Sequence, residues 1–426
     1  MKKSSRAPAL LLPVAAILIA GVATPRAQEL GAREIPPAPP PAAVPVSLGA
    51  PPEAPVAPEE ARPAPPAIPP APSAPPPLVG EPRLDAALGR FVAPLGDRKA
   101  TLTLDPRLQE RLERSLASYK VPWGATVLLE PHTGRVLALA EHSHAEPGRH
   151  GFALSAMAPA ASVFKIVTAA ALLERGAAAD GEVCWHGGKR RLQPTLLRDD
   201  PRRDHRCSSL TSAFGHSTNV VFAKLADRDL DPGTLRSTAE RFLFNAPIPF
   251  SRPVEVSRAS IPDEPFAAAN AAAGFGEVRL SPLHGALLAA IVANGGVLVP
   301  PVLVEDASGA APPEPRRVVG EAVAARLADM MRETVVSGTA RRAFRRPGGP
   351  LRGVTVAGKT GSLAEARPYR DYSWFVGYAP ADRPEVAVAT VVANERLWHA
   401  RAPTVAKEAL EAYFAARAGG VRTAAR

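Results

Sequence analysis

The sequence predicts an α+β fold: a five-stranded antiparallel sheet with terminal helices on one face and a mainly helical second region on the other. Three observations lead to this prediction. Residues 124–140 have the pattern of a β-hairpin, residues 354–393 hold three further β-rich runs, and residues 156–340 between them are mostly helical and loop-like. The hairpin and the three runs together supply the five strands.

The first elements of this fold follow from their periodicity. Residues 105–119 carry leucines at positions 108, 112 and 116, a spacing that predicts an amphipathic helix. Residues 124–130 and 135–140 are β-rich and flank the turn Pro131-His132-Thr133-Gly134, which predicts a hairpin. We expect the folded region to begin near Leu84, ahead of this helix.

The last elements follow from their end signals and their connections. Residues 286–293 are apolar and run into Asn294-Gly295-Gly296, which predicts a helix that ends at glycine. The short connections between the β-rich runs predict an antiparallel meander, and residues 403–416 predict a closing helix. The three runs are residues 354–357, 373–379 and 385–393.

The N-terminal part differs in composition from the rest. Residues 1–27 combine a basic start with an uncharged stretch, and they predict either a cleaved signal peptide or a retained membrane anchor. Residues 28–80 are mostly proline and alanine, and residues 31–80 hold 19 of the 49 prolines. Such a stretch favours extended polyproline II, so we expect a disordered tether. Residues 81–420 remain for the folded domain.

Charge and export limit the classes of function. The formal net charge is +10 and the sequence pI is about 10.0, which indicates an anionic partner or many solvated arginines. No nucleic-acid motif accompanies this charge, so we expect no nucleic acid as a partner. Either interpretation of residues 1–27 places the bulk of the chain outside the cytoplasm, in a periplasm or at the outer face of the cytoplasmic membrane.

Ser162 and Lys165 lie at the start of residues 161–174, an apolar run whose composition favours a helix. Positions i and i+3 share one helix face, so the hydroxyl and the amine would be neighbours at the helix N-terminus. A desolvated, neutral lysine there can take the serine proton and so create a nucleophile. The alternative is that Ser162 is an ordinary N-cap.

Two further motifs favour the catalytic interpretation. Ser217-Thr218-Asn219 begins 55 residues after Ser162, and Lys359-Thr360-Gly361 begins 142 residues after Ser217. Ser-x-x-Lys, a Ser-x-Asn type element and Lys-Thr-Gly are together the signature of class A β-lactamases and penicillin-binding proteins. Through these motifs, residues 100–417 resemble the transpeptidase domain of penicillin-binding proteins, with the fold of the β-lactamase-like superfamily.

The resemblance implies a catalytic role for five residues. Ser162 would attack a peptide carbonyl to form an acyl-enzyme, with Lys165 as its general base. Ser217 would relay a proton towards the leaving amine. Asn219 would bind the substrate amide or Lys165, and Lys359 would set a positive field.

The resemblance also implies that the segment around Lys-Thr-Gly binds the substrate. Thr360 and Ser362 would hold the terminal carboxylate, and Gly361 would let the substrate approach closely because it has no side chain. The backbone N–H groups of Ser162 and Ser362 would form the oxyanion hole. No metal and no cofactor is expected.

The sequence departs from the family pattern in small details and in size. Ser362 stands where threonine is common, a change that keeps the hydroxyl, and Val163 follows the nucleophile where Gly-Ser-Thr is frequent. We expect neither a glycosyltransferase module before residue 100 nor the large pedestal domain usual in class B enzymes. What remains is a near-minimal transpeptidase domain behind a proline tether.

The two cysteines leave three interpretations open. In an oxidising compartment, Cys184 and Cys207 would form a disulfide, and elsewhere they would be free thiols. His186 and His205 give a Cys-x-His and a His-x-Cys pattern, so the four side chains could also hold zinc, although the spacing is tighter than in usual zinc sites.

The combined features favour a peptidoglycan D,D-transpeptidase or D,D-carboxypeptidase that acts on stem peptides and binds β-lactam antibiotics covalently. Two alternatives stay open. One is a serine β-lactamase, although no Glu-x-x-Leu-Asn stretch is present for deacylation. The other is a non-catalytic sensing or scaffolding module of the same fold. A glycosyltransferase or another cell-wall synthesis protein is the expected partner, together with the membrane if residues 1–27 are retained.

Overall fold

The computed structural model describes residues 75–424 except 189–190, 306–313 and 346–348. The predicted signal peptide or anchor and nearly all of the predicted tether lie outside the described residues. Within the described part, no helix is long and apolar enough to cross a membrane. Leu78, in the last residues assigned to the tether, is buried, and its N–H donates to the Ser251 carbonyl at 2.8 Å. The packed region therefore begins slightly before residue 81.

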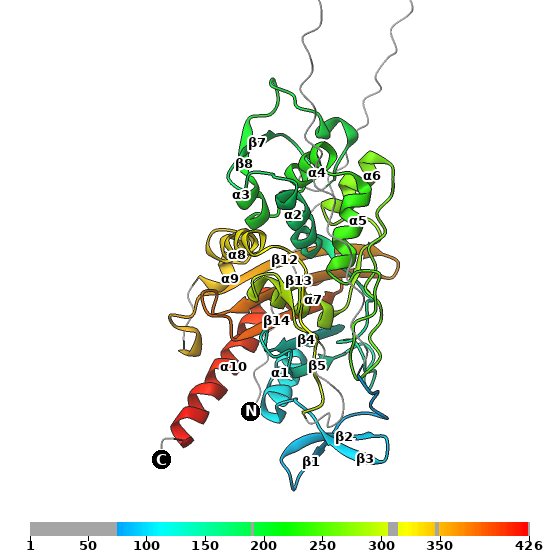
Figure 1. The fold of residues 1–426 in the computed structure, drawn as a ribbon, viewed down its shortest axis with the longest axis vertical. Helices are drawn as coiled ribbons and strands as arrows, with labels where there is room; N and C mark the ends of the chain where they lie inside the picture. Colours follow the sequence, from blue (N-terminus) through cyan, green and yellow to red (C-terminus); the bar gives the residue numbers. More distant parts are fainter. Residues whose placement is uncertain (1–74, 189–190, 306–313, 346–348, 425–426) are drawn as a thin grey trace, which may run out of the picture. The chain divides into compact units, whose positions relative to one another are not determined.

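One five-stranded antiparallel sheet forms the centre of the domain (Figure 1), as predicted. The strand order is β12-β13-β14-β4-β5, so the C-terminal meander pairs through β14 with the N-terminal hairpin. β12 is therefore an edge strand. The strands are β4 Trp123–Leu129, β5 Val136–His142, β12 Ala357–Ala366, β13 Tyr369–Ala379 and β14 Val386–Asn394.

The terminal helices α1 (Pro106–Ser118) and α10 (Ala402–Ala424) cover one face of the sheet. Side chains alternate along each strand, so Leu128, Val388 and Phe375 point to this face and pack in the same apolar cluster as Leu112. The N-terminus of α1 is capped by Asp105, whose carboxylate accepts from two backbone N–H groups.

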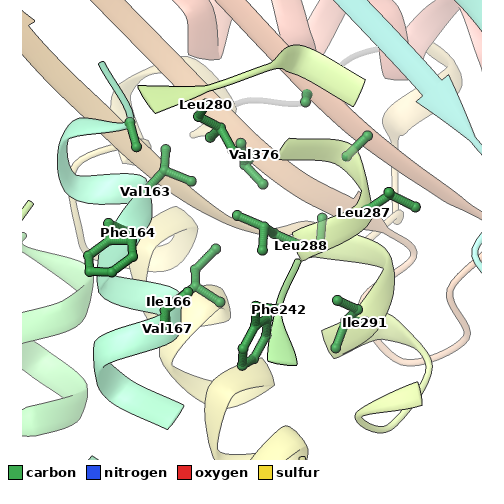
Figure 2. Close-up of a cluster of buried hydrophobic side chains, with 14 of the residues drawn as sticks. Val163, Phe164, Ile166, Val167, Phe242, Leu280, Leu287, Leu288, Ile291 and Val376 are labelled. Carbon is green, nitrogen blue, oxygen red and sulfur yellow. The ribbon is translucent and has the colours of Figure 1, made fainter. Parts of the chain in front are cut away.

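The opposite face packs against α7 (Pro282–Ala293), which is buried along almost its whole length. The predicted glycine signal ends this helix, because Gly295 just beyond it has a φ of +61°. Figure 2 shows Leu287, Leu288 and Ile291 of α7 in the same buried cluster as Phe164 and Val167. The segment that carries Ser162 and Lys165 is thus packed against the same core as the sheet.

The remaining elements form the helical region and four small sheets. The helices are α2 Lys165–Glu174, α3 Leu210–Gly215, α4 Asn219–Asp229, α5 Pro232–Arg241, α6 Pro265–Ala272, α8 Glu321–Val336 and α9 Arg341–Phe344, with short 3₁₀ turns η1 Ala161–Phe164, η2 Pro194–Leu197 and η3 Gly349–Leu351. The small sheets pair β1 Arg83–Asp85, β2 Arg90–Leu95 and β3 Arg98–Thr101; β6 Ala158–Pro159 with β9 Arg279–Leu280; β7 Glu182–Trp185 with β8 Arg206–Ser209; and β10 Val297–Leu298 with β11 Arg316–Arg317.

Two local expectations need correction, and one small sheet was not predicted. The run 161–174 is not one α-helix, because residues 161–164 form η1 and α2 begins at Lys165. The first of the three β-rich runs, residues 354–357, was placed too early, because β12 spans Ala357–Ala366 and forms a hairpin ten residue pairs long with β13, with Lys359-Thr360-Gly361 inside it. The three-stranded sheet β1-β2-β3 was not predicted, because its strands are short and carry no apolar alternation.

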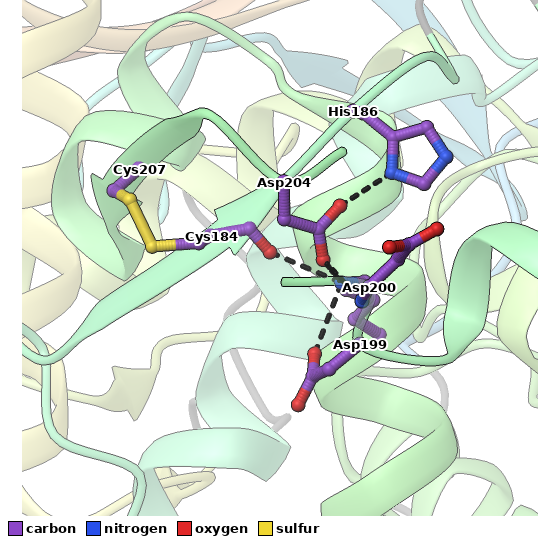
Figure 3. Close-up of a disulfide and its surroundings, with 7 residues drawn as sticks. Cys184, His186, Asp199, Asp200, Asp204 and Cys207 are labelled. Carbon is purple, nitrogen blue, oxygen red and sulfur yellow. Dashed lines mark hydrogen bonds and ion pairs between the residues drawn. A yellow bond between two sulfur atoms is a disulfide. The ribbon is translucent and has the colours of Figure 1, made fainter. Parts of the chain in front are cut away.

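Cys184 and Cys207 face each other across β7 and β8, and their sulfurs form a disulfide. Figure 3 shows the disulfide with His186, Asp199 and Asp204 near it, and α4 packs against β7. The buried Lys224 amine of α4 donates to the Cys184 carbonyl at 3.0 Å and to Asp204 at 2.7 Å. His186 contacts the other oxygen of Asp204, so it serves this ion-pair network and the cysteines are not available for zinc.

Leu112→Ala is expected to lower the free energy of unfolding by about 2–5 kcal/mol, because Leu112 is 1% exposed between α1 and the sheet and the change leaves a cavity. Urea unfolding followed by circular dichroism measures this. Arg111→Ala, at an exposed position on the same helix, should change the value by less than about 0.5 kcal/mol. Equal effects of the two substitutions would contradict the packing described here.

The double substitution Cys184→Ser with Cys207→Ser is expected to lower the free energy of unfolding by about 3 kcal/mol, because the disulfide closes a loop with a sequence separation of 23. The measurement is urea unfolding with and without reductant. Reductant should destabilise the unsubstituted protein and leave the double variant unchanged. A reductant effect on the double variant would show that another group is responsible.

Candidate active site

The three sequence motifs meet at one place in the structure. The Lys165 Nζ lies 3.0 Å from the Ser162 Oγ and 2.8 Å from the Asn219 Oδ1. The Lys359 Nζ lies 3.0 Å from the Ser217 Oγ. Residues up to 197 positions apart in the sequence thus form two serine–lysine pairs at the junction of η1, α4 and β12.

The backbone around Ser162 depends on a close contact with Gly274. Ala161, just before Ser162, has a φ of +49°, a region that residues other than glycine rarely adopt. Gly274 has a φ of +91°, and a Cβ atom there would lie 2.3 Å from the Ala161 carbonyl oxygen. No side chain fits at this position, so Gly274 allows the turn that presents Ser162 to the cavity.

Lys165 is fully buried, and this changes its acid–base behaviour. Burial, and then the nearby positive charge of Lys359, hold the pKa of the Lys165 amine well below its usual range. A neutral amine has two N–H donors and one lone pair. Its two N–H groups can donate hydrogen bonds to the Asn219 Oδ1 and the Ala273 carbonyl, and its lone pair is then left to accept from the hydroxyl of Ser162.

Lys359 is the second buried amine of the site. Burial lowers its pKa to about 7, so it can exchange a proton near neutral pH. The amine donates to the Ser217 Oγ and to the Thr360 carbonyl, and it lies 5.3 Å from the centre of the Phe214 ring. Ser217 itself is held at a φ of +56° between α3 and α4, which directs its hydroxyl towards the cavity side of Lys359.

The edge strand β12 lies against η1, the segment that carries Ser162. Gly361 is close to it, because a Cβ atom at this position would lie 3.2 Å from both the Ala160 carbonyl and the Val163 side chain. The Thr360 Oγ1 is 2.6 Å from the Thr339 Oγ1, and Ser362 is exposed. Ser162, Ser217, Asn219, Thr360, Gly361 and Ser362 all line one cavity of about 820 Å³.

Sequence reasoning missed the groups that complete the site. The Ala273 carbonyl orients Lys165, and Thr339 holds Thr360. The only sequence signals were glycines beside them, Gly274 and Gly338, since a Cβ atom at Gly338 would lie 2.1 Å from the Gly215 carbonyl. Among the residues that the structure describes, no group of three or more histidine, cysteine or acidic side chains is placed to hold a metal ion.

This fold and these two serine–lysine pairs are those expected of the class that comprises penicillin-binding proteins and serine β-lactamases. Residues 124–413 match the family model of the penicillin-binding protein transpeptidase domain, which is more than half of the chain. The protein therefore belongs to that family.

Curated relatives support this assignment. The peptidoglycan D,D-transpeptidase PbpA of Mycobacterium tuberculosis is 30% identical over 337 residues, covering 68% of this chain and 66% of the relative's own length. The penicillin-binding protein PbpB of Mycolicibacterium smegmatis is 28% identical over 331 residues, covering 68% of this chain and 50% of the relative. The chain thus spans at most about two thirds of these relatives.

Solved structures show the same fold. The crystal structure of PBPA from M. tuberculosis has a TM-score of 0.59 and 27% identity, covering 74% of this chain and 80% of that chain. An imipenem acyl-enzyme complex of the same mycobacterial protein has a TM-score of 0.59 and 28% identity, covering 74% of this chain and 79% of that chain.

The buried amine of Lys359 makes the stability depend on pH. Its pKa is about 7 in the folded protein and about 10.4 in the unfolded chain. Between these values the unfolded chain holds the proton and the folded protein does not, so raising the pH favours folding. From pH 7 to 9 the free energy of unfolding should rise more steeply than in Lys359→Met, by up to about 1.4 kcal/mol per pH unit.

Urea unfolding of both proteins at pH 7, 8 and 9 measures this difference. Lys407→Met, at a partly exposed lysine on α10, is the matched control and should keep the slope of the unsubstituted protein. Parallel pH profiles for the unsubstituted protein and Lys359→Met would show that Lys359 keeps an ordinary pKa.

Proposed function

We propose that the protein is a peptidoglycan D,D-transpeptidase that works through a Ser162 acyl-enzyme and is acylated by β-lactams. The observation that carries this proposal is the Lys165 amine 3.0 Å from the hydroxyl of Ser162: burial lowers the pKa of the amine, and Ser162 lines a large cavity. The names of the mycobacterial relatives and the imipenem acyl-enzyme of one of them support it.

In the proposed acylation, the lone pair of Lys165 takes the hydroxyl proton while the Ser162 Oγ attacks the penultimate D-alanine carbonyl. The backbone N–H groups of Ser162 and Ser362 stabilise the oxyanion. The proton then reaches the leaving amine through Ser217, whose hydroxyl accepts a hydrogen bond from Lys359. The products are an ester on Ser162 and free D-alanine.

The substrate's terminal carboxylate is assigned to the edge strand. Thr360 and Ser362 supply hydroxyl donors there, and protonated Lys359 supplies the nearest buried positive charge. Gly361 leaves the strand open to the substrate backbone. A β-lactam places its own carboxylate in the same position and its strained amide at the nucleophile.

The fate of the acyl group separates the related activities. An amine acceptor gives a transpeptidase and water gives a D,D-carboxypeptidase. We favour the transpeptidase because the relatives carry that name and because the cavity extends well beyond the nucleophile. We place this activity outside the cytoplasm, with residues 1–27 as export signal or anchor and residues 28–80 as tether, beside a glycosyltransferase or another cell-wall synthesis protein.

Benzylpenicillin should acylate the protein at Ser162, adding the mass of one intact drug molecule for many minutes. Ser162→Ala should show no addition, and Lys165→Ala should be acylated at least about 100-fold more slowly, because general-base catalysis contributes about 10²–10⁴-fold. Intact-mass spectrometry of the full chain measures both. His216→Ala, next to Ser217 but exposed, is the matched control and should acylate at the ordinary rate.

Two outcomes would overturn the proposal. A transient mass increase with accumulating hydrolysed drug would identify a β-lactamase. No addition to a folded protein would leave a non-catalytic module of this fold as the better description.

A further inference from the structure

The active-site cavity does not end at the nucleophile. Beyond Thr360 and Ser362 it passes over the edge of β12 and reaches α9 on one side and the first turns of α10 on the other. The residues that line this extension include Arg342, Arg401 and Lys407. The functions assigned to the three motifs account for none of these cations.

The register of β12 and β13 shows that the extension faces the carboxylate-binding hydroxyls. Thr360 pairs with Phe375 and Ser362 pairs with Ser373, so each pair points to the same side of the sheet. That side is the α10 side, because the Ser373 hydroxyl accepts from the N–H of Ala402 at 3.0 Å. Lys359 and Gly361 point to the other side, towards the nucleophile.

The extension carries one sign of charge. The described residues that line the cavity include three cations and no carboxylate. Arg342 makes no ion pair with any described residue, while Lys407 pairs with Glu411 at 3.2 Å. The Arg401 guanidinium lies 4.6 Å from the centre of the Trp398 ring. Cations at the edge of a cavity attract anionic ligands and raise their local concentration.

The chemistry of the proposed reaction indicates which ligand would bind in this cationic extension of the cavity. In the proposed acylation, the D-alanine that leaves binds with its carboxylate at Thr360 and Ser362, and its amine lies next to the acyl carbon. An acceptor amine attacks the acyl carbon from the position that the leaving amine vacated. The reason is that deacylation by an amine is the reverse of acylation with loss of an amine. The rest of the acceptor must then extend away from the nucleophile, into the cationic part of the cavity.

We propose that Arg342, Arg401 and Lys407 form the acceptor subsite and select an amine that carries a second carboxylate beyond its α-carboxylate. This inference rests on the proposed function. In the step it governs, the acceptor nitrogen forms a bond to the acyl carbon and the bond from that carbon to the Ser162 Oγ breaks. The amine proton passes through the Lys165 and Ser217 network to the Ser162 Oγ, which restores the free hydroxyl.

The test is a competition between two acceptors of equal size. D-glutamate and D-glutamine differ only in the charge of the side-chain end. The full chain is acylated with an N-acyl-D-alanyl thioester in the presence of both amines, and the two amide products are quantified by liquid chromatography and mass spectrometry. The unsubstituted protein should favour D-glutamate by about fivefold, as expected for a few partly exposed charge-assisted contacts.

The triple variant Arg342→Gln, Arg401→Gln, Lys407→Gln should bring the product ratio to within about twofold of one. Raising the salt from 0.1 M to 1 M should reduce the preference of the unsubstituted protein in the same direction, because the screening length falls from about 10 Å to about 3 Å. Arg341→Gln, on the same helix α9 but outside the cavity lining, is the matched control and should keep the preference.

The outcomes separate this inference from the function on which it rests. A product ratio near one in the unsubstituted protein would overturn the inference, and so would a ratio unchanged by the triple variant. In both cases an amine still resolves the acyl-enzyme, so the proposed transpeptidase stands. An acyl-enzyme that only water resolves would overturn the transpeptidase assignment and the acceptor subsite with it, while the Ser162 acylation stands. If benzylpenicillin and the thioester both fail to acylate Ser162, the proposed function is overturned and the acceptor subsite with it.

Discussion

The site depends on one buried amine. Lys165 is fully enclosed, and its contacts with Asn219 and the Ala273 carbonyl fix both its position and the direction of its lone pair. An amine in water would be protonated and would have no lone pair to offer the serine. The surrounding helices therefore contribute to the chemistry of the site, because burying Lys165 lowers the pKa of its amine and favours the neutral, basic form.

A second buried amine, Lys359, gives the site two serine–lysine pairs, one from each structural layer. Lys359 enters from the sheet and Lys165 from the helical region, so the two structural layers each contribute one serine–lysine pair. The charge of Lys359 also lowers the pKa of Lys165 further. A protonated Lys359 thus favours a neutral Lys165, which suits a reaction that needs a base for the nucleophile and a positive charge for the substrate carboxylate.

The backbone is strained at two positions of the site, and the surrounding packing must hold both in place. Ala161 and Ser217 both have positive φ values, each of which costs about 1–3 kcal/mol and persists only where surrounding contacts enforce it. The enforcing contacts are the close approach of Gly274 to Ala161 and the placement of Ser217 between α3 and α4, a region braced further out by the disulfide hairpin and Lys224. Fold stability and site geometry are therefore coupled here.

The sequence by itself determined the fold class and the principal site residues, because periodicity and turn signals are local and the three motifs fix chemistry by residue type. It predicted the meander, the glycine-ended α7 and the residues of the three motifs that the structure brings together. Only the tertiary structure decided the rest. The Ala273 carbonyl and the Thr339 hydroxyl act through contacts between distant segments, and folding brings Arg342 and Arg401 to one cavity. A backbone carbonyl or a single surface arginine has no sequence pattern that marks it as part of a site, so its place at the cavity appears only in the folded structure.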